Sequence, residues 1–258
     1  LANTSALSST TIDGGAGSDS IAAVGAYANA ATFTDMDSLT LTAGTTGSVS
    51  TITGSSATAV AAGVGAQTIT STSSALTTIS APTVATTSIV TGASTGAYNI
   101  TTDAGNLVLI NAAASTAGAL TVVSANMTGN ALAITEGSAN AATVLVSGGD
   151  SGDTITVTGS ATAHTFTSTA TSKISYTGGA GTQTITTGAG ADTITGGAGA
   201  DIIVTGTGAD IVIIAATDGI DTITFSAGTD IDTVRTSAVA SANYFNATGF
   251  RRFYSCGV

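Results

Sequence analysis

The sequence predicts an all-β protein, a parallel β-solenoid built from stacked two-strand coils. Short strands of Thr and aliphatic residues recur along the chain, and Gly, Ser, Asn and Asp fill the stretches between them. Helix-forming Glu, Lys, Gln and Arg are nearly absent: only 7% of the 258 residues are charged. A set of nine-residue repeats near the C-terminus supplies the third observation, because identical units suit the stacking of identical coils.

The predicted strands follow one another about every ten residues. Examples are LTLTA at residue 39, QTITS at 67, LVLIN at 107 and TITVT at 154. This period fits two arrangements: an antiparallel sandwich or barrel, and coils of two strands and two turns. The nine-residue repeats favour the solenoid, whereas the repeats over 23–147 are looser and leave the N-terminal half less defined.

Changes in repeat character divide the chain into three expected regions. Residues 1–147 form a Thr/Ala/Ser-rich β-repeat region, and residues 148–234 hold the nine-residue repeats. Residues 235–258 carry three of the four basic residues and three of the six Phe, a break in composition that indicates a C-terminal tail or cap.

The composition argues against several classes of partner. The formal net charge is -11, so no basic patch can form to bind nucleic acid or an anionic membrane surface. No run of 18 or more apolar residues is present, which predicts no membrane insertion. The single cysteine, Cys256, cannot form an intrachain disulfide, and this fits an extracellular bacterial protein stabilised by metal or by assembly.

The nine-residue repeats place an Asp at a fixed position. TGAGADTIT, GGAGADIIV and TGTGADIVI follow one another over 187–213, with Asp192, Asp201 and Asp210 in sixth place. The aliphatic residue in eighth place is expected to point into the coil interior. That interior row comprises Ile185, Ile194, Ile203 and Val212.

Each repeat would make half a coil, so turns two repeats apart stack on the same side. Asp192 is then expected against Asp210, with Asp201 on the opposite side, stacked with Gln183 and near Asp218 and Asp221. Carboxylates one strand spacing apart, about 4.8 Å, repel each other by about 1 kcal/mol in water and by more in a drier site. A hard divalent cation between the turns would remove that repulsion.

Backbone carbonyls of the turn glycines are the expected additional ligands. These glycines are Gly188, Gly190, Gly197, Gly199, Gly206 and Gly208. Because all the ligands are oxygens, with no His or Cys nearby, the site selects Ca2+ over zinc or copper. Degenerate copies of the repeat add further candidate ligands: Asp19, Asp153, Asp218, Asp221 and Asp230. In GGAGTQTIT at residue 178, Gln183 replaces the Asp, and that turn is expected to be structural only.

At these residues the chain resembles the RTX-repeat family, whose consensus is GGxGxDxUx with U a large aliphatic residue. Together with the acidic, Lys-poor composition, the resemblance is to the surface-layer members of the family. It implies type I secretion, calcium-dependent folding outside the cell, a location at the cell surface and self-assembly into a homo-oligomeric lattice. A cell-surface polysaccharide is a further implied partner. Three alternatives stay open: a secreted filament or matrix-fibre subunit, an RTX adhesin, and a fragment of an RTX enzyme.

No catalytic set is expected, and the chain is predicted not to be an enzyme. GDSGD at 149–153 resembles a serine-protease motif but lies inside a degenerate repeat, without an oriented base. GASTG at 92–96 lacks the strand–turn–helix context of a nucleophile elbow. His164, the only histidine, is expected in a turn or on the surface.

Overall fold

The computed structural model describes the backbone of residues 11–24, 31–35, 163–214, 219–227, 229–237, 245–248 and 252–256, and of the strands between residues 38 and 159 whose bounds follow, with Gly159. All regular secondary structure in these residues is β-strand. None of the described residues form a helix whose length and hydropathy would let it cross a membrane.

The strands belong to two sheets that alternate along the chain. The 13-stranded sheet contains β1 (Thr11–Asp13), β3 (Ala31–Thr34), β5 (Ser48–Thr53), β7 (Gln67–Ser71), β9 (Thr87–Thr91), β11 (Val108–Ala112), β13 (Ala131–Glu136), β15 (Thr154–Thr158), β17 (Lys173–Thr177), β19 (Thr193–Thr195), β21 (Ile211–Ile214), β23 (Thr233–Ser237) and β25 (Arg252–Cys256). The 12-stranded sheet contains β2 (Ser20–Val24), β4 (Ser38–Thr42), β6 (Thr58–Ala61), β8 (Thr77–Ala81), β10 (Tyr98–Thr102), β12 (Leu120–Ser124), β14 (Thr143–Gly148), β16 (His164–Ser168), β18 (Gln183–Thr186), β20 (Ile202–Val204), β22 (Asp221–Thr224) and β24 (Phe245–Thr248).

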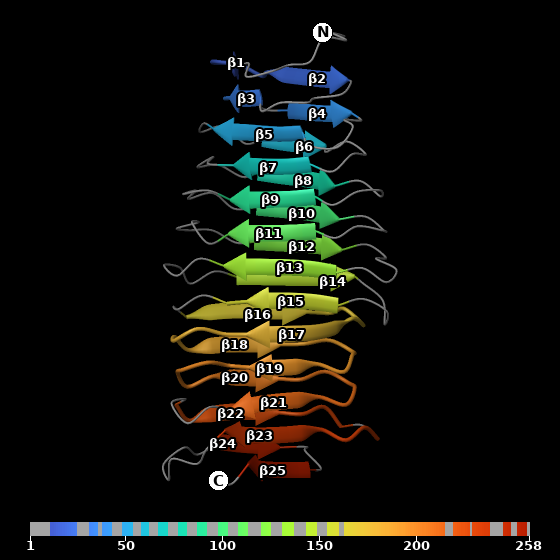
Figure 1. The fold of residues 1–258 in the computed structure, drawn as a ribbon, viewed down its shortest axis with the longest axis vertical. Helices are drawn as coiled ribbons and strands as arrows, with labels where there is room; N and C mark the ends of the chain where they lie inside the picture. The colour runs from blue at the N-terminus through green and yellow to red at the C-terminus, as the bar shows by residue number, and fades with distance from the viewer. Residues whose placement is uncertain are drawn as a thin grey trace.

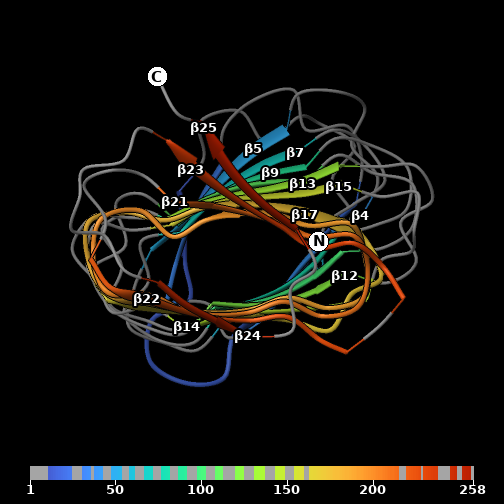
Figure 2. The ribbon, with the colours of Figure 1, turned by 90° about the horizontal axis from the view of Figure 1, so that it is seen from below.

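Each strand pairs in parallel with the strand two places along the chain, as β17 does with β19 and β18 with β20. Figure 1 shows the resulting stack, with one strand of each sheet in every coil. Figure 2 looks along the stack and shows the two sheets facing each other, with the chain turning at both ends of an elongated outline. The predicted parallel β-solenoid is therefore confirmed, and the antiparallel sandwich does not occur among the described strands.

The N-terminal repeats, although looser in sequence, form the same kind of coil as the C-terminal repeats. Both sheets cross the expected boundary after residue 147, because β13 pairs with β15 and β14 with β16. The tail adds to the sheets as well: β24 pairs with β22 and β25 with β23. The division into three regions stays a prediction based on the sequence. The two sheets run through all three regions.

The interior lies between the two sheets and is filled by alternate residues of each strand. The strand β15 shows the pattern, with Ile155 and Val157 buried and the three threonines exposed. All four residues of the predicted interior row are buried, with exposed fractions of 0% to 1%. In register they form two rows, Ile194 with Val212 in one sheet and Ile185 with Ile203 in the other. Alternation in the sequence thus identified the core correctly.

Candidate metal site

The aspartate of each nine-residue repeat lies at the end of a turn, directly before a short strand. Asp192 precedes β19, Asp201 precedes β20 and Asp210 precedes β21. Although these side chains belong to turns, their exposed fractions are only 0% to 1%. Buried carboxylates need hydrogen bonds or a cation to offset the loss of water, so their partners determine what the site can do.

One side of the solenoid carries a first column, defined as Asp192, Asp210 and Asp232. The Ile174 backbone N–H donates to Asp192 Oδ1 at 2.8 Å, and the Asp192 N–H donates to Asp210 Oδ1 at 2.9 Å. The Asp210 N–H in turn donates to Asp232 Oδ1 at 3.1 Å. Each carboxylate therefore caps the backbone of the preceding coil, and the expected stacking of Asp192 with Asp210 is confirmed.

The opposite side carries a second column, defined as Asp201 and Asp221. The Gln183 N–H donates to Asp201 Oδ1 at 2.8 Å, and the Asp201 N–H donates to Asp221 Oδ1 at 2.9 Å. Asp221 is also buried, with 2% of its surface exposed. The predicted neighbours of Asp201, Gln183 on one side and Asp221 on the other, are both found.

Burial makes ionisation of the first column costly. Desolvation raises the pKa of Asp192 from 3.8 to about 6, although the N–H of Ile174 and the Thr187 hydroxyl act in the opposite direction. Desolvation likewise raises the pKa of Asp210 to about 7, against the N–H of Asp192 and the Thr205 hydroxyl. Repulsion from Asp192 and Asp232 raises the pKa of Asp210 further. In the protein alone, the hydrogen bonds of this column offset only part of the cost of burying its negative charges.

Only one oxygen of each of these carboxylates is bonded well. Oδ2 of Asp192 and Oδ2 of Asp210 are buried and make no well-formed hydrogen bond. The hydroxyl oxygens of Thr187 and Thr205, although close enough to lower the two pKa values, also lack one. Buried oxygens without a well-formed hydrogen bond are uncommon in folded proteins, and these are available to an ion or a water. Here they form a set of anionic and neutral oxygens, which are ligands of a hard cation.

The turns that hold these aspartates stack too closely for side chains. Gly199 and Gly208 have φ values of 137° and 129°, and a Cβ on either would collide with the carbonyl of the glycine one coil earlier, Gly181 or Gly190. The same close approach to a preceding backbone carbonyl occurs at Gly188, Gly190, Gly197 and Gly206. Glycine therefore lets one turn present its carbonyl oxygens to the next turn.

These donors fit the calcium expectation. Within the described residues, no three His, Cys, Asp or Glu side chains gather into a metal-binding group. The ligands besides the aspartates would therefore be backbone and hydroxyl oxygens, which calcium accepts in a flexible coordination shell. Asp192 and Asp210, with the carbonyls of Gly188, Gly190, Gly206 and Gly208, would hold the ion on the first column. The geometry of that shell, and each residue's part in it, stay predictions.

The remaining predicted aspartates are placed differently. Asp230 is exposed, and Asp232 occupies the first column in its place, with 5% of its surface exposed. The signal that sequence reasoning missed is the aliphatic residue two places on: Asp232 is followed by Thr233 and Val234, as Asp221 is by Thr222 and Ile223. Asp153 and Asp218 lie outside the described residues.

Asp19 belongs to a separate turn at the N-terminal end of the solenoid. Gly15 and Gly17 have positive φ values of 77° and 139°, so this turn resembles the one at Gly197 and Gly199. The Gly15 N–H donates to Asp13 Oδ1 at 3.1 Å, and a Cβ at Gly14 would collide with the next turn at Asp35. The isolated repeat therefore keeps the turn shape, far along the stack from the two columns (Figure 1).

The expectation for His164 was wrong. It begins strand β16 facing inward, with 3% of its surface exposed, and its Nδ1 lies 2.8 Å from the Tyr176 hydroxyl oxygen. The sequence AHTFTS alternates small polar and aromatic residues, and the structure puts His164 and Phe166 on the interior face. The cause is strand alternation, which outweighed the polarity of the side chain.

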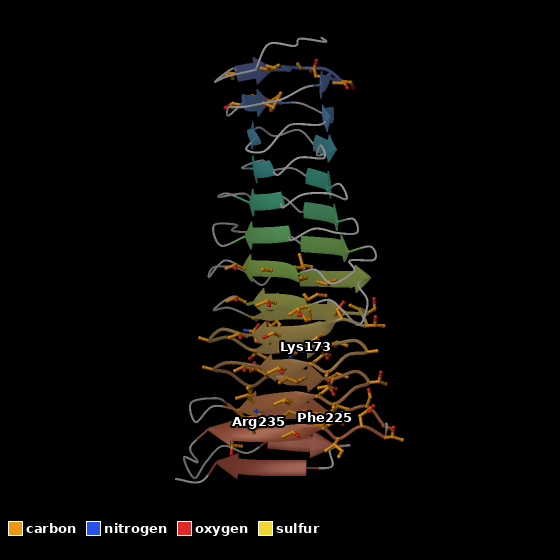
Figure 3. All side chains as sticks on the ribbon, turned by 45° about the vertical axis from the view of Figure 1, so that its right-hand side comes forward. Lys173, Phe225 and Arg235 are labelled. Carbon is orange, nitrogen blue, oxygen red and sulfur yellow. The ribbon has the colours of Figure 1, made fainter. Side chains whose placement is uncertain are left out.

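The cations of this region do not reach the first column. Figure 3 labels Lys173 on β17 and Arg235 on β23, and both side chains are exposed. Neither is among the groups that shift the pKa of Asp192 or Asp210. Phe225, also labelled, follows β22 and is buried, with 3% of its surface exposed.

Comparison with known proteins agrees with this geometry. A family model described as the RTX calcium-binding nonapeptide repeat matches residues 9–23 and 177–212, in four copies. Searches of curated proteins and of solved structures found no match. The matched segments contain the Asp19 turn and the turns of Asp192, Asp201 and Asp210. These segments of the chain therefore carry RTX-type nonapeptide repeats, which are calcium-binding motifs.

Proposed function

We propose that this chain is a structural extracellular protein that folds with calcium and self-assembles into a bacterial surface layer. The observation that carries the calcium part is the first column, where Asp192 and Asp210 bury carboxylate oxygens with no well-formed hydrogen bond. A cation bound there would offset the cost of burying these charged oxygens and make the fold more favourable at neutral pH.

The two oxygens of each column aspartate have different proposed roles. Oδ1 of each column aspartate holds the backbone N–H of the preceding coil, which sets the stacking of the turns. Oδ2 and the glycine carbonyls remain for a cation. A bound calcium supplies positive charge between turns that otherwise repel, and this links the folded state to the calcium concentration.

Localisation and assembly rest on the family and on composition. RTX-repeat proteins are typically secreted by type I systems, which supports the proposed location outside the cell, where calcium is plentiful. The proposed role is structural and not catalytic, because the column aspartates are engaged in stacking backbone turns. The proposed partners are further copies of this chain, with a cell-surface polysaccharide as the anchor.

A filament subunit is the second candidate. It is favoured by the two sheets, which run without a break from β1 and β2 to β24 and β25 along one axis (Figure 1). Such a stack makes a rod, and rods that join along their axis make a fibre. An RTX adhesin would instead stay monomeric and bind a ligand.

The calcium part is tested by titrating calcium into EGTA-treated protein and following circular dichroism. We expect strand signal to rise with calcium and to fall again when EGTA is added. D192N/D210N should lose the response, whereas the exposed-site variant D230N should keep it. A spectrum that ignores both calcium and EGTA would overturn the proposal.

The assembly part is tested by negative-stain microscopy of the calcium-loaded protein. Ordered sheets support the surface layer and rods support the filament. Monomers at every concentration tested would reject both and favour the adhesin.

A further inference from the structure

The nine-residue repeat at 178–186 has Gln183 in the aspartate position. Gln183 directly precedes Asp201 in the second column, because its N–H donates to Asp201 Oδ1. One coil earlier, the residue in register with Gln183 is His164. In these two successive coils, Gln183 and His164 therefore take the positions that carboxylates occupy in the second column.

Both polar atoms of the Gln183 side chain make hydrogen bonds within the protein. Its Nε2 donates to the Gly181 carbonyl oxygen at 2.9 Å, and its Oε1 accepts from the Tyr176 hydroxyl at 3.4 Å. The amide N–H thus takes up a carbonyl of its own turn, where a carboxylate would have no proton to offer. Gln183 has 0% of its surface exposed, so these bonds are made in the interior.

Aromatic packing closes the same coil. The Tyr176 ring stacks on the His164 ring at 6.1 Å between centroids, and it meets the Phe166 ring at 5.3 Å. The hydroxyl of Tyr176 also lies 2.8 Å from His164 Nδ1. His164, Phe166 and Tyr176 each have 3% or less of their surface exposed. Together with Gln183 they form a buried cluster that joins the two sheets.

The first column ends at the same level of the stack. The residue in register before Asp192 is Ile174, and Ile155 precedes Ile174 in the paired strands. Both isoleucines have 0% of their surface exposed. Among the described residues, both columns therefore begin only after this coil, and the coil itself is held by apolar packing and neutral hydrogen bonds.

We propose that Gln183, through its bonds to Gly181 and Tyr176, ends the calcium-dependent part of the solenoid. The inference rests on the proposed calcium-dependent folding and adds the position along the solenoid at which that dependence ends. Strands β13–β17 then stay folded without calcium, and β19–β23 order onto them only when calcium is bound. The His164–Phe166–Tyr176–Gln183 cluster then forms the folded end onto which the calcium-bound coils pack.

Hydrogen exchange with mass spectrometry tests this limit on the full chain, in EGTA and in calcium. In EGTA, we expect amides of β13–β17 to exchange at least about tenfold more slowly than those of β19–β23. In calcium the two groups should be protected alike. Equal, fast exchange of both groups in EGTA would overturn the inference, because the coils before Gln183 would then depend on calcium too.

The variant Q183D moves the limit, and T182D is its matched control. Both variants add one carboxylate, but the Thr182 side chain is exposed, whereas Gln183 is buried and lies one coil before Asp201, in register with it. Q183D should lose protection of β16–β18 in EGTA by at least about tenfold and regain it in calcium, while T182D exchanges like the parent. Identical behaviour of Q183D and T182D would contradict the role of Gln183.

Two further outcomes have separate meanings. If calcium does not change the exchange rates of β19–β23 in the parent protein, the calcium-dependent folding itself is rejected. The proposed limit at Gln183 is then rejected with it. A Q183D chain that is unfolded even in calcium leaves the parent protein's exchange profile in EGTA to decide whether the limit exists.

Discussion

The coils before Gln183 and the coils after it solve the same stacking problem with different chemistry. Strand β15 of the earlier coils sends Ile155 and Val157 into the interior. Strand β19 of the later coils sends in Ile194 alone, and the other inward position is taken by Asp192. At this position in the 13-stranded sheet, the change from isoleucine to aspartate gives up about 1.5–3 kcal/mol of apolar burial. Calcium, where it binds, replaces that stabilisation and makes it conditional.

The largest effect should come from removing the two first-column charges. The variant D192N/D210N keeps an oxygen to accept each N–H but abolishes the buried charge. In EGTA at pH 8 we expect the variant to be more stable than the parent by about 3–4 kcal/mol per site. The reason is that folding raises the pKa values of Asp192 and Asp210 from 3.8 to about 6 and 7, so the folded parent holds both carboxylates charged at a cost.

In calcium the order should reverse, because the parent gains a bound ion and the variant does not. Urea unfolding in the two buffers measures both differences, and D230N serves as the control. A variant less stable than the parent in EGTA would mean that the charges are not buried at a cost.

Changing pH should separate the two regions without mutation. Because the pKa of Asp192 and Asp210 is raised on folding, their contribution to stability is complete below pH 3.8 and is lost as pH rises through about 6 and 7. In EGTA, going from pH 8 to pH 5 should therefore stabilise the later coils by roughly 1–3 kcal/mol per carboxylate.

Hydrogen exchange at the two pH values, corrected for the intrinsic rate, gives this gain strand by strand. Strands β19–β23 should respond more than β13–β17, and saturating calcium should suppress the gain. A gain that is equal in both regions would remove the link to the first column.

The apolar interior of the later coils is thin, so each of its residues should count heavily. Ile194→Ala deletes the inward aliphatic residue of β19 and should cost about 2–5 kcal/mol in calcium. Ile202→Ala, at an outward position that is 46% exposed, should stay within about 0.5 kcal/mol of the parent. Thermal unfolding of both variants in calcium checks the pair, and equal losses would show that Ile194 is not the core of its coil.

The smallest expected effect distinguishes two neighbouring aspartates. Asp232→Asn removes a charge that repels Asp210, and it should lower the pKa of Asp210, whereas Asp230→Asn should leave it unchanged. Carboxyl titration by nuclear magnetic resonance in EGTA, at low temperature, measures the shift. A larger shift from D230N than from D232N would place the wrong residue in the first column.

Local sequence rules accounted for the fold and for the stacking of the repeat aspartates. Thr and aliphatic alternation located the strands and the interior row at Ile185, Ile194, Ile203 and Val212. The fixed spacing of Asp192, Asp201 and Asp210 predicted two sides and the correct neighbours, because stacking one coil on the next is a translation that the repeat length encodes.

Other features depended on register that spacing alone does not reveal. Asp221 and Asp232 follow Asp201 and Asp210 by 20 and 22 residues instead of 18, so only strand pairing shows that they continue the columns. The extra residues lengthen the turns, while the strands stay aligned because the ladder hydrogen bonds and the inward aliphatic residues keep their positions.

From the sequence alone follow the strand alternation, the two-sided spacing of the repeats and the oxygen chemistry that selects calcium, because all three are local or periodic properties. The tertiary structure decided which carboxylates become buried, why their pKa values rise, and where the carboxylate columns stop. The physical reason is that desolvation and hydrogen bonding depend on residues one coil away, as they do at Gln183, His164 and Tyr176. Only the folded stack brings those residues together.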